Sequence, residues 1–588
     1  MTNESNNSTT TITSFIWQVA DDILRDIYVK GKYRDVILPM VVLTRIDSEL
    51  VQTKTKTLSE YDRYKDKITN IQPILERCTG YNFYNISPFT FRSLLQDPDN
   101  IDKNFLVYLN GFSDNIQDIL TKFKFYNQIQ TLKESEILFV LIQKFTTKSE
   151  ELSPKNLNNH DMGYVFEELI RKFNEENNEE AGEHFTPREV IKLMTNLLFL
   201  PVKSKVKNTP LSIYDPCVGS GGMLSLAKDF LRLPESGIES TADIFTFGQE
   251  INPETYALCK ADMLLKGERD NQVAFGSTLS QDGFPSDKFD FILTNPPYGK
   301  SWKTDQDKLT VSEGGKKKGE ILDSRFQVGT PRINDGQLLF ILHMLSKVKH
   351  DTPLGTRIAS VHNGSALFTG DAGSGESQIR KHLIENDYIE SIVALPKDLF
   401  YNTGIGTYIW VLTNRKPTHK KGKIQLINAT SSQFCAKMTK SLGNKRQELK
   451  QSHIDSIYHM FDTFEEGQYS KIFDNDDFGY TQIQTQQPKR DETGNIILKK
   501  GKPEPDIKFN DKENIPLKMD IQEYFDREVL PFAPDAFYTI DTAKVGYEIN
   551  FNKYFYEYTP PRELADIVKD IFALEKETDG VLKGIIKN

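Results

Sequence analysis

The sequence contains little cysteine, and none of it is clustered. Its four cysteines, Cys78, Cys217, Cys259 and Cys435, are far apart and show no paired spacing. Disulfide frameworks and zinc sites need regularly or closely spaced cysteines, so neither is expected. This usage is typical of a protein that works in a reducing cytosol. We therefore expect a cytoplasmic location and no bound metal.

Long hydrophobic runs are also missing. No apolar stretch of the sequence approaches the roughly 18 residues that a membrane helix needs, so no membrane contact is expected. Residues 1–13 are rich in Ser, Thr and Asn and have no signal-peptide core, which predicts a disordered tail. The sequence also has no Walker helicase motif and no nuclease carboxylate cluster, which disfavours a self-sufficient restriction enzyme.

The sequence also lacks an excess of basic residues. The chain carries 73 Lys and Arg against 83 Asp and Glu, a formal charge of -10. Proteins that bind DNA alone usually present a basic face, because phosphate contacts carry much of the affinity. A local basic face is compatible with an acidic total. The balance nevertheless indicates that a partner supplies part of any grip on DNA.

The N-terminal part of the sequence, residues 14–155, has the pattern of a helical region. Phe15, Val19, Ile23 and Ile27 recur every four residues and form a broad apolar stripe. Further apolar helices are predicted over 36–46 and 137–145. The region shows no nuclease or nucleotide signature, so we interpret it as an N-terminal domain for packing or assembly.

From residue 211 short strands alternate with helices, which is typical of an α/β fold. We predict a doubly wound, mostly parallel, seven-stranded sheet inside a catalytic domain at 156–430. The last two strands are separated by a Gly-containing turn region, which permits the final strand to run antiparallel. The predicted strands are 211–214, 244–248, 272–275, 289–294, 357–361, 389–395 and 407–413.

Residues 431–588 form a C-terminal extension in which the pattern weakens. Residues 480–515 are polar and predict a flexible excursion. The segment 300–335 is likewise polar, and it is too long to be only a connector. The chain ends in a predicted helix whose apolar seam needs a partner helix, in this chain or another. Its seam positions are Leu564, Ile567, Ile571, Leu574, Thr578, Val581 and Ile585.

A glycine loop follows the first predicted strand. The strand runs into Asp215-Pro-Cys-Val-Gly219-Ser220-Gly221-Gly222, and a helix follows. Such a turn places a ligand at the carboxyl edge of a parallel sheet, and glycines let the backbone approach it closely. The loop is neither a Walker loop nor G-x-G-x-x-G. Pro216-Cys217 also matches the nucleophile of cytosine-C5 methyltransferases, but its place inside the glycine loop disfavours that role.

Two further strand ends carry candidate site residues. The second strand ends at Glu250, where an acid would hydrogen-bond a ribose diol. The fourth ends at Asn295-Pro296-Pro297-Tyr298. Because proline fixes φ and restricts the residue before it, Asn295 is held extended. By itself the motif is either a proline turn with an exposed tyrosine or a pocket whose acceptors and ring hold a planar amine.

Taken in order, these elements resemble a known family. A Phe-Thr-Pro element at 185–187, the glycine loop, the strand-tip acid and Asn-Pro-Pro-Tyr resemble S-adenosylmethionine-dependent methyltransferases that act on adenine in DNA. More narrowly, the chain resembles the modification subunit of type I restriction-modification systems. The narrower likeness rests on residues 15–46, 182–188, 335–340, 363–365, 373–377 and 399–410.

The resemblance implies a fold, a cofactor and site residues. It implies the S-adenosylmethionine-dependent methyltransferase fold, with Asp215 and Gly219 shaping the glycine loop and Glu250 holding the ribose. Asn295, Pro296, Pro297 and Tyr298 would hold the target adenine. Ser277, at the end of the third strand, stands where related enzymes often carry Asp or Asn near the cofactor's adenine. The methionine end of the cofactor would be lined by Glu183, His184, Phe185, Thr186, Pro187, Arg188, Ser220, Gly221 and Gly222.

The resemblance also implies partners. These are DNA, a specificity subunit flanked by two modification subunits, and a restriction or translocase subunit as a further component. Two other interpretations stay open on the sequence alone. A protein glutamine methyltransferase can use the same Asn-Pro-Pro-Tyr to hold an amide nitrogen. An assembly subunit with a degenerate cofactor fold is the non-enzymatic alternative.

Overall fold

The computed structural model of the chain forms two compact units, residues 1–549 and 550–588. It describes residues 3–176, 186–269, 272–310, 321–401, 403–499, 501–556 and 562–586. Across these ranges, no helix has both the length and the apolar character needed to cross a membrane.

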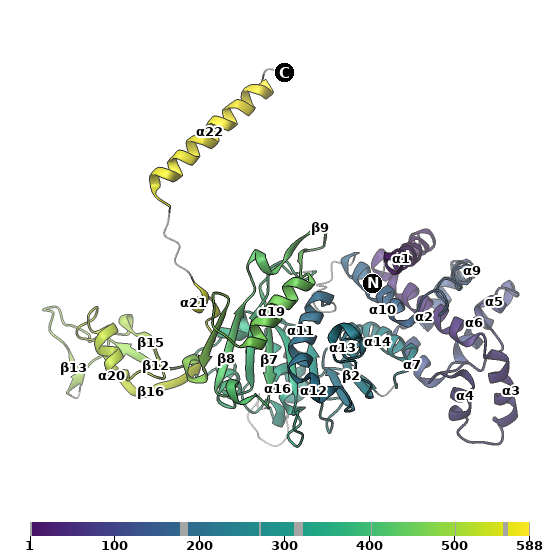
Figure 1. Ribbon diagram of the computed structural model, residues 1–588, viewed down its shortest axis with the longest axis horizontal. Coiled ribbons are helices and arrows are strands. Elements are labelled where there is room, and N and C mark those ends of the chain that lie inside the picture. Colours follow the sequence, from purple (N-terminus) through teal and green to yellow (C-terminus); the bar gives the residue numbers. More distant parts are fainter. Residues whose placement is uncertain are drawn as a thin grey trace. The chain divides into compact units, whose positions relative to one another are not determined.

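The N-terminal third of the first unit is helical, as the sequence predicts (Figure 1). The helix α1 begins at Asn3, so it includes most of the stretch predicted to be a disordered tail. Nucleation is the unfavourable step of helix formation. Once an apolar stripe has nucleated a helix, extending it through poor helix formers costs little free energy. The helices are α1 (Asn3–Leu24), α2 (Arg34–Leu50), α3 (Lys54–Tyr64), α4 (Gln72–Thr79), α5 (Phe91–Leu94), α6 (Ile101–Asn110), α7 (Asp114–Lys122), α8 (Tyr126–Glu134), α9 (Leu138–Thr147) and α10 (Asn159–Glu176).

The hydrophobic core of these helices continues into a helix of the sheet region. Ala257, Leu258 and Ala261 of α14 (Pro253–Leu265) belong to the same buried cluster as the side chains of α2 and α9. Polar contacts reinforce this packing, because Asp118 of α7 accepts from both Lys260 Nζ and Tyr256 Oη at 2.8 Å. The two regions therefore share one core.

The centre of the unit is a single sheet with strand order β11-β8-β6-β7-β5-β4-β1-β2-β3. Neighbouring strands from β3 to β5 are parallel, whereas β7 runs antiparallel to both β5 and β6. The strands are β1 (Leu211–Asp215), β2 (Ile244–Glu250), β3 (Val273–Phe275), β4 (Phe291–Thr294), β5 (Arg357–Asn363), β6 (Ile389–Ala394), β7 (Thr407–Thr413), β8 (Lys423–Asn428) and β11 (Ser470–Asp474).

The predicted α/β class and the antiparallel seventh strand are confirmed, but the sheet is larger than predicted. It has nine strands, because β8 and β11 extend it beyond β6. Consequently the sheet runs past residue 430, where the sequence predicts the catalytic domain to end. The strand β11 pairs antiparallel with β8 as an edge strand and is short. Edge strands need few apolar residues, which explains why its sequence gives little signal.

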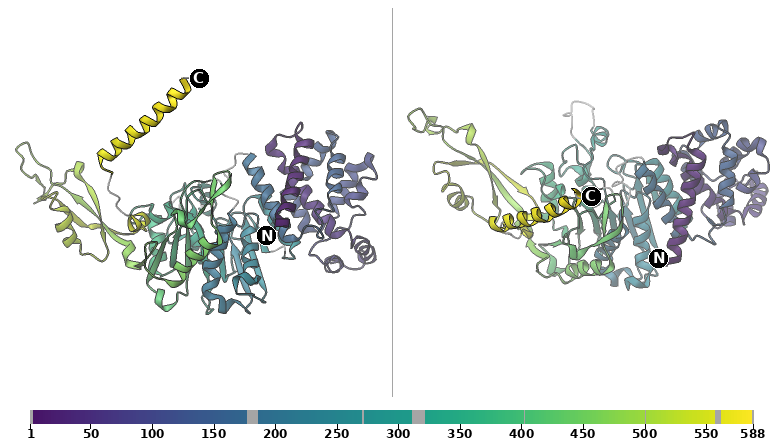
Figure 2. Two further views of the ribbon diagram at one scale, coloured as in Figure 1. Left: turned by 45° about the horizontal axis from the view of Figure 1, so that its top comes forward. Right: turned by 90° about the horizontal axis from the view of Figure 1, so that it is seen from above.

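Helices cover both faces of the sheet (Figure 2). Successive side chains of a strand point to opposite faces. Ile213 packs with α11 (Arg188–Phe199), α13 (Gly222–Arg232) and α19 (Gln451–Thr463). Tyr214 points to the other face, where it stacks on Phe289 and contacts His343 of α16 (Gln337–Ser346). The remaining helices are α12 (Lys203–Val206), α15 (Lys303–Leu309), α17 (Ser365–Phe368) and α18 (Gly375–Glu385).

The residues after β11 contain more regular structure than the sequence predicts. An antiparallel sheet of order β15-β12-β16 lies where a flexible excursion is predicted. Ile483 and Ile515 are fully buried beneath it and pack with Phe525. In β12 and β15 most of the other positions are polar, so polar residues dominate the composition of these two strands. The elements after β11 are β12 (Gly479–Gln486), β13 (Leu498–Lys499), β14 (Lys502–Pro503), β15 (Asp511–Pro516), α20 (Ile521–Tyr524) and β16 (Phe537–Tyr547). Before β11, the strands β9 (Ala436–Leu442) and β10 (Lys445–Glu448) form a separate antiparallel pair.

The second unit contains two helices, α21 (Phe551–Phe555) and α22 (Leu564–Ile586). The predicted terminal helix is therefore present. Seam residues Leu564, Ile571 and Leu574 are each more than half exposed. The side chains of Thr578, Val581 and Ile585 lie outside the described part of the helix.

Candidate functional site

The glycine loop connects β1 to α13 and is shaped by two left-handed glycines. Gly219 has φ +56° and Gly221 has φ +86°, a region that side chains with a Cβ adopt only with strain. At Gly222, the first residue of α13, a Cβ would collide with the Glu167 carboxylate. The loop is thus a cradle whose backbone is open to a ligand.

Asp215 ends β1 directly beneath this loop. It is almost fully buried, and its Oδ1 accepts from the Cys217 backbone N–H at 2.9 Å. Burial raises the pKa of Asp215 to about 7, because a charged carboxylate is disfavoured away from water. Burial also raises the pKa of the Cys217 thiol well above its usual value. A thiolate nucleophile needs the opposite shift, so the geometry disfavours Cys217 in that role.

Glu250 ends β2, beside the loop. Its Oε2 accepts from the Gly219 backbone N–H at 3.0 Å, and its Oε1 accepts from the Asn252 backbone N–H at 2.7 Å. Both oxygens are thereby fixed at the carboxyl edge of the sheet, where the sequence predicts a ribose-binding acid.

Asn295 follows β4 at the same edge. Its side chain is 8% exposed, and no described residue donates a hydrogen bond to its buried Oδ1. Buried acceptors without donors are rare in proteins and call for an explanation. Tyr298 packs against the core cluster that includes α11 and α13, and burial raises its pKa to about 12. Pro296 is buried between them.

A hydrogen-bonded support lies under this turn and was not assigned a role from the sequence. Asp335 Oδ1 accepts from the Gly299 backbone N–H at 3.0 Å, and Oδ2 accepts from Gln337 Nε2 and Ser365 Oγ, both at 2.8 Å. Gln337 Nε2 also donates to Asn363 Oδ1 at 2.8 Å. Segments that contributed only to the family likeness, 335–340 and 363–365, therefore hold the Asn-Pro-Pro-Tyr turn in place.

An ion pair closes the other side of the glycine loop. Arg188, at the start of α11, contacts the carboxylate of Glu167 from α10, and its guanidinium lies 3.1 Å from the centre of the Tyr164 ring. Burial raises the pKa of Glu167, which Lys266 opposes, and burial lowers the pKa of Arg188, which nearby acidic side chains oppose. Glu167 was missed from the sequence. Its only signal there is a carboxylate on the otherwise apolar face of a helix.

These residues line two neighbouring cavities that meet at Cys217. The first, here the glycine-loop cavity, brings together residues from four separate segments. The second, here the strand-tip cavity, lies beside Glu250 and Pro297. The predicted residues Glu183, His184 and Phe185 lie outside the described residues. The glycine-loop cavity is lined by Glu167, Thr186, Arg188, Ile191, Asp215, Cys217, Val218, Gly219, Ser220, Gly222, Met223 and Asn295.

Four predicted residues line neither cavity but belong to the turns and helix starts that form the cavity walls. Pro187 precedes the first residue of α11, and Gly221 precedes the first residue of α13. Pro296 and Tyr298 build the turn after Asn295. The predicted residues that the structure describes thus lie together near the ends of β1, β2 and β4.

Comparison with protein families identifies the chain. A family model described as N-6 DNA Methylase matches residues 157–490, which is more than half of the sequence. The chain belongs to the N-6 DNA methylase family. A second model, the HsdM N-terminal domain, matches residues 12–145 of this methylase. Together the two matches confirm the predicted likeness to type I modification subunits.

Individual relatives agree with this assignment. The methylase is 27% identical over 499 residues to the type I restriction enzyme MjaIX methylase subunit of Methanocaldococcus jannaschii, covering 77% of each chain. It is 27% identical over 320 residues to the HindI methylase subunit of Haemophilus influenzae, covering 54% of this chain and 65% of that one. The crystal structure of a type I methyltransferase subunit from Streptococcus thermophilus superposes with a TM-score of 0.59 at 21% identity, covering 80% and 97% of the two chains, and confirms the fold.

Proposed function

We propose that this methylase transfers the methyl group of S-adenosylmethionine to the N6 amino group of adenine in double-stranded DNA. A separate specificity subunit would choose the target sequence. The observation that carries the proposal is the buried Asn295 Oδ1, an acceptor that no described residue satisfies, on a residue that lines the glycine-loop cavity. An exocyclic amine is the donor that this acceptor lacks.

The residues around the cavities fit S-adenosylmethionine. Its methionine part carries an ammonium and a carboxylate, and the glycine-loop cavity is lined by one acidic and one basic side chain, Glu167 and Arg188. The glycine cradle leaves room for close approach of the backbone. Glu250 would take the ribose hydroxyls. When bound, the cofactor supplies an activated methyl group on a sulfonium sulfur.

The chain's own residues would position and polarise the amine. The lone pair of the adenine amine is delocalised into the ring, so the amine is a poor nucleophile. Hydrogen bonds from its two N–H groups to Asn295 Oδ1 and the Pro296 carbonyl disfavour that planarity and stabilise positive charge as it develops. The base must leave the duplex to reach this site, and Tyr298 offers a ring on which it stacks, worth about 1–3 kcal/mol.

Asn295→Ala tests the proposal. The variant keeps the cofactor residues but loses the acceptor, so we expect methyl transfer to fall about 100-fold or more, while cofactor affinity stays within about threefold. The assay uses labelled cofactor, duplex DNA and the co-expressed specificity subunit, together with equilibrium cofactor binding. Asn386→Ala, an exposed asparagine on the same unit, is the matched control. Substantial turnover by Asn295→Ala would refute the assignment.

The same assay decides between DNA and protein as the methyl acceptor. Labelled protein in place of labelled DNA would favour the glutamine methyltransferase interpretation. The membership of the N-6 DNA methylase family and the helical N-terminal domain favour DNA.

We further propose that the active assembly contains a specificity subunit flanked by two copies of this chain, with a restriction or translocase subunit as a further component. The support is the acidic total charge and the exposed apolar positions of α22. Residues with such exposure on a long helix are typical of a helix that packs against a partner.

A further inference from the structure

The strand-tip cavity contains a second carboxylate besides Glu250. Asp305 of α15 lines this cavity together with Trp302, Leu279 and Phe340. Asp305 comes from the segment 300–335, for which the sequence suggested no role. An acid from this segment at a cofactor cavity therefore needs an explanation.

Asp305 is held by two hydroxyl groups. Ser277 Oγ donates to Asp305 Oδ1 at 2.6 Å, and Ser280 Oγ donates to the same oxygen at 2.7 Å. Both serines belong to the turn after β3. Both donors reach Oδ1. No described residue donates a hydrogen bond to Oδ2, so Oδ2 is available as an acceptor.

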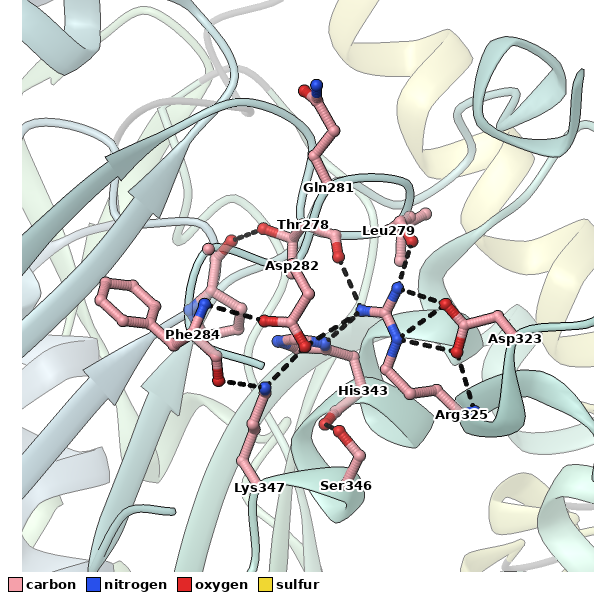
Figure 3. Close-up of polar contacts among 12 residues, drawn as sticks. Thr278, Leu279, Gln281, Asp282, Phe284, Asp323, Arg325, His343, Ser346 and Lys347 are labelled. Carbon is pink, nitrogen blue, oxygen red and sulfur yellow. Dashed lines mark hydrogen bonds and ion pairs between the residues drawn. The ribbon is translucent and has the colours of Figure 1, made fainter. Parts of the chain in front are cut away.

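Arg325 anchors the turn that holds Asp305 (Figure 3). Arg325 donates to the Thr278 carbonyl at 2.9 Å and to the Leu279 carbonyl at 2.6 Å. Its guanidinium also pairs with Asp323 at 2.7 Å.

A second ion pair fixes the far end of the same turn. Lys347 Nζ contacts Asp282 Oδ2 at 2.6 Å, and His343 Nδ1 lies 2.8 Å from Arg325 Nη1. The turn 277–282 is thereby fastened at several points, and a fixed turn gives Asp305 a fixed position.

The surroundings of Asp305 define the chemistry of a matching group. Trp302 is 3% exposed and Phe340 is 8% exposed, so the cavity offers apolar walls to a planar ring. Glu250 already accepts two backbone N–H groups near the ribose position. A carboxylate acceptor in the wall of such a cavity matches a ring that carries an amino group at its edge.

We propose that Asp305 recognises the exocyclic amino group of the cofactor's adenine, so that α15 completes the cofactor site. The inference rests on the proposed function, because it requires S-adenosylmethionine in these cavities. Ser277 does not fill this acceptor role, because its hydroxyl donates to Asp305. The acceptor is instead Asp305, which follows the Asn-Pro-Pro-Tyr motif in the chain. Asp305 is a cofactor-binding residue in this account.

The test compares two ligands that differ at the ring edge that carries this amino group, where a carbonyl oxygen in place of the amine also puts a proton on N1. S-adenosylhomocysteine carries the amine, and S-inosylhomocysteine carries a carbonyl oxygen in its place. Titration calorimetry with the full chain measures both affinities for the wild type and for Asp305→Asn. The exposed Asp307, which pairs with Lys303 at 2.6 Å on the same helix, provides the matched control Asp307→Asn.

We expect the wild type to prefer S-adenosylhomocysteine by about tenfold or more, since only the amine donates a hydrogen bond from this position to the charged carboxylate. In Asp305→Asn the amide N–H₂ would face the ligand as a donor, so the preference should fall at least about tenfold or reverse. Asp307→Asn should keep the wild-type preference. Thermal melting of the three proteins shows whether each is folded.

Each other result refutes a definite claim. An unchanged preference in folded Asp305→Asn would overturn the role of Asp305 and leave the proposed function intact. A wild type that binds neither ligand would overturn the cofactor assignment, and the inference would fall with it. An equal loss of preference in Asp307→Asn would show a general charge effect and would also overturn the inference.

Discussion

Asp215 and Asn295 end neighbouring strands, and burial affects each of them differently. Asn295 cannot ionise, so its buried oxygen stays an acceptor at every pH. Asp215 can ionise, and burial shifts its pKa toward neutrality. The chemistry of this sheet edge therefore depends on pH through Asp215, and not through the residue that holds the amine.

Asp215→Asn should change how stability depends on pH. The unfolded carboxyl ionises near pH 4, whereas the native one keeps its proton until about pH 7. Between these values the native state binds more protons, so the free energy of unfolding falls as pH rises. From pH 5 to 8 we expect the wild type to lose about 1–3 kcal/mol relative to Asp215→Asn. Urea midpoints at both pH values measure this change.

The exposed Asp287, for which Asp287→Asn is the control, should leave the pH dependence of the wild type unchanged. Parallel curves for the wild type and Asp215→Asn would contradict the expected protonation of the native carboxyl. The measurement is made without cofactor, because a bound ligand stabilises the native state independently of Asp215.

At the scale of elements, the turn after β4 depends on a helix that starts 40 residues later. Asp335 precedes α16 and ties Gly299 to Gln337 and Ser365. A strand end alone does not fix the proline turn. The start of α16 and the end of β5 provide the other half of its support.

Asp335→Ala should therefore weaken catalysis more than cofactor binding. Misplacing a reacting group by about 1 Å can cost on the order of 100-fold in rate, so we expect kcat to fall about 10- to 100-fold. The affinity for S-adenosylhomocysteine should change less than about threefold, since Asp335 lines neither cavity. Steady-state methylation and calorimetry measure the two effects. Asp351→Ala is an exposed control, and equal losses in both measurements would contradict a role confined to the turn.

The sequence predicted the elements whose signal is local. The first seven strands were predicted within a few residues, because each apolar run ends at a polar, Gly or Pro residue. The glycine loop, Glu250 and Asn295 were found because they immediately follow such strands. Glu167, Asp305 and Asp335 lie on helices or in loops far along the chain. Only the folded structure brings them to the site, so no local pattern marks them.

The elements that were missed also have physical causes. The sheet β15-β12-β16 has few inward positions, and polar residues dominate its sequence. The start of α1 depends on cooperative extension from residues farther along and not on the residues within it. In both segments the amino-acid composition reflects the exposed positions, so it does not indicate the regular structure that forms.

At the scale of the whole molecule, we expect α22 to be needed for assembly and not for cofactor binding. Removal of residues 557–588 should leave S-adenosylhomocysteine binding within about twofold, because every residue lining the two cavities belongs to the first unit. The truncated chain should lose the specificity subunit on co-purification. Mass measurement of the co-expressed complexes checks this, and recovery of a full-mass complex without α22 would contradict it.

The core shared by the N-terminal helices and α14 limits how this chain can be recombined with its relatives. Ala257, Leu258 and Ala261 lie in the middle of the catalytic sequence, yet they pack in the N-terminal core. A chimera joined near residue 155 would therefore set one relative's helices against another's α14 and leave gaps or clashes in a close-packed interior. A functional exchange of N-terminal domains has to transfer the inner face of α14 as well.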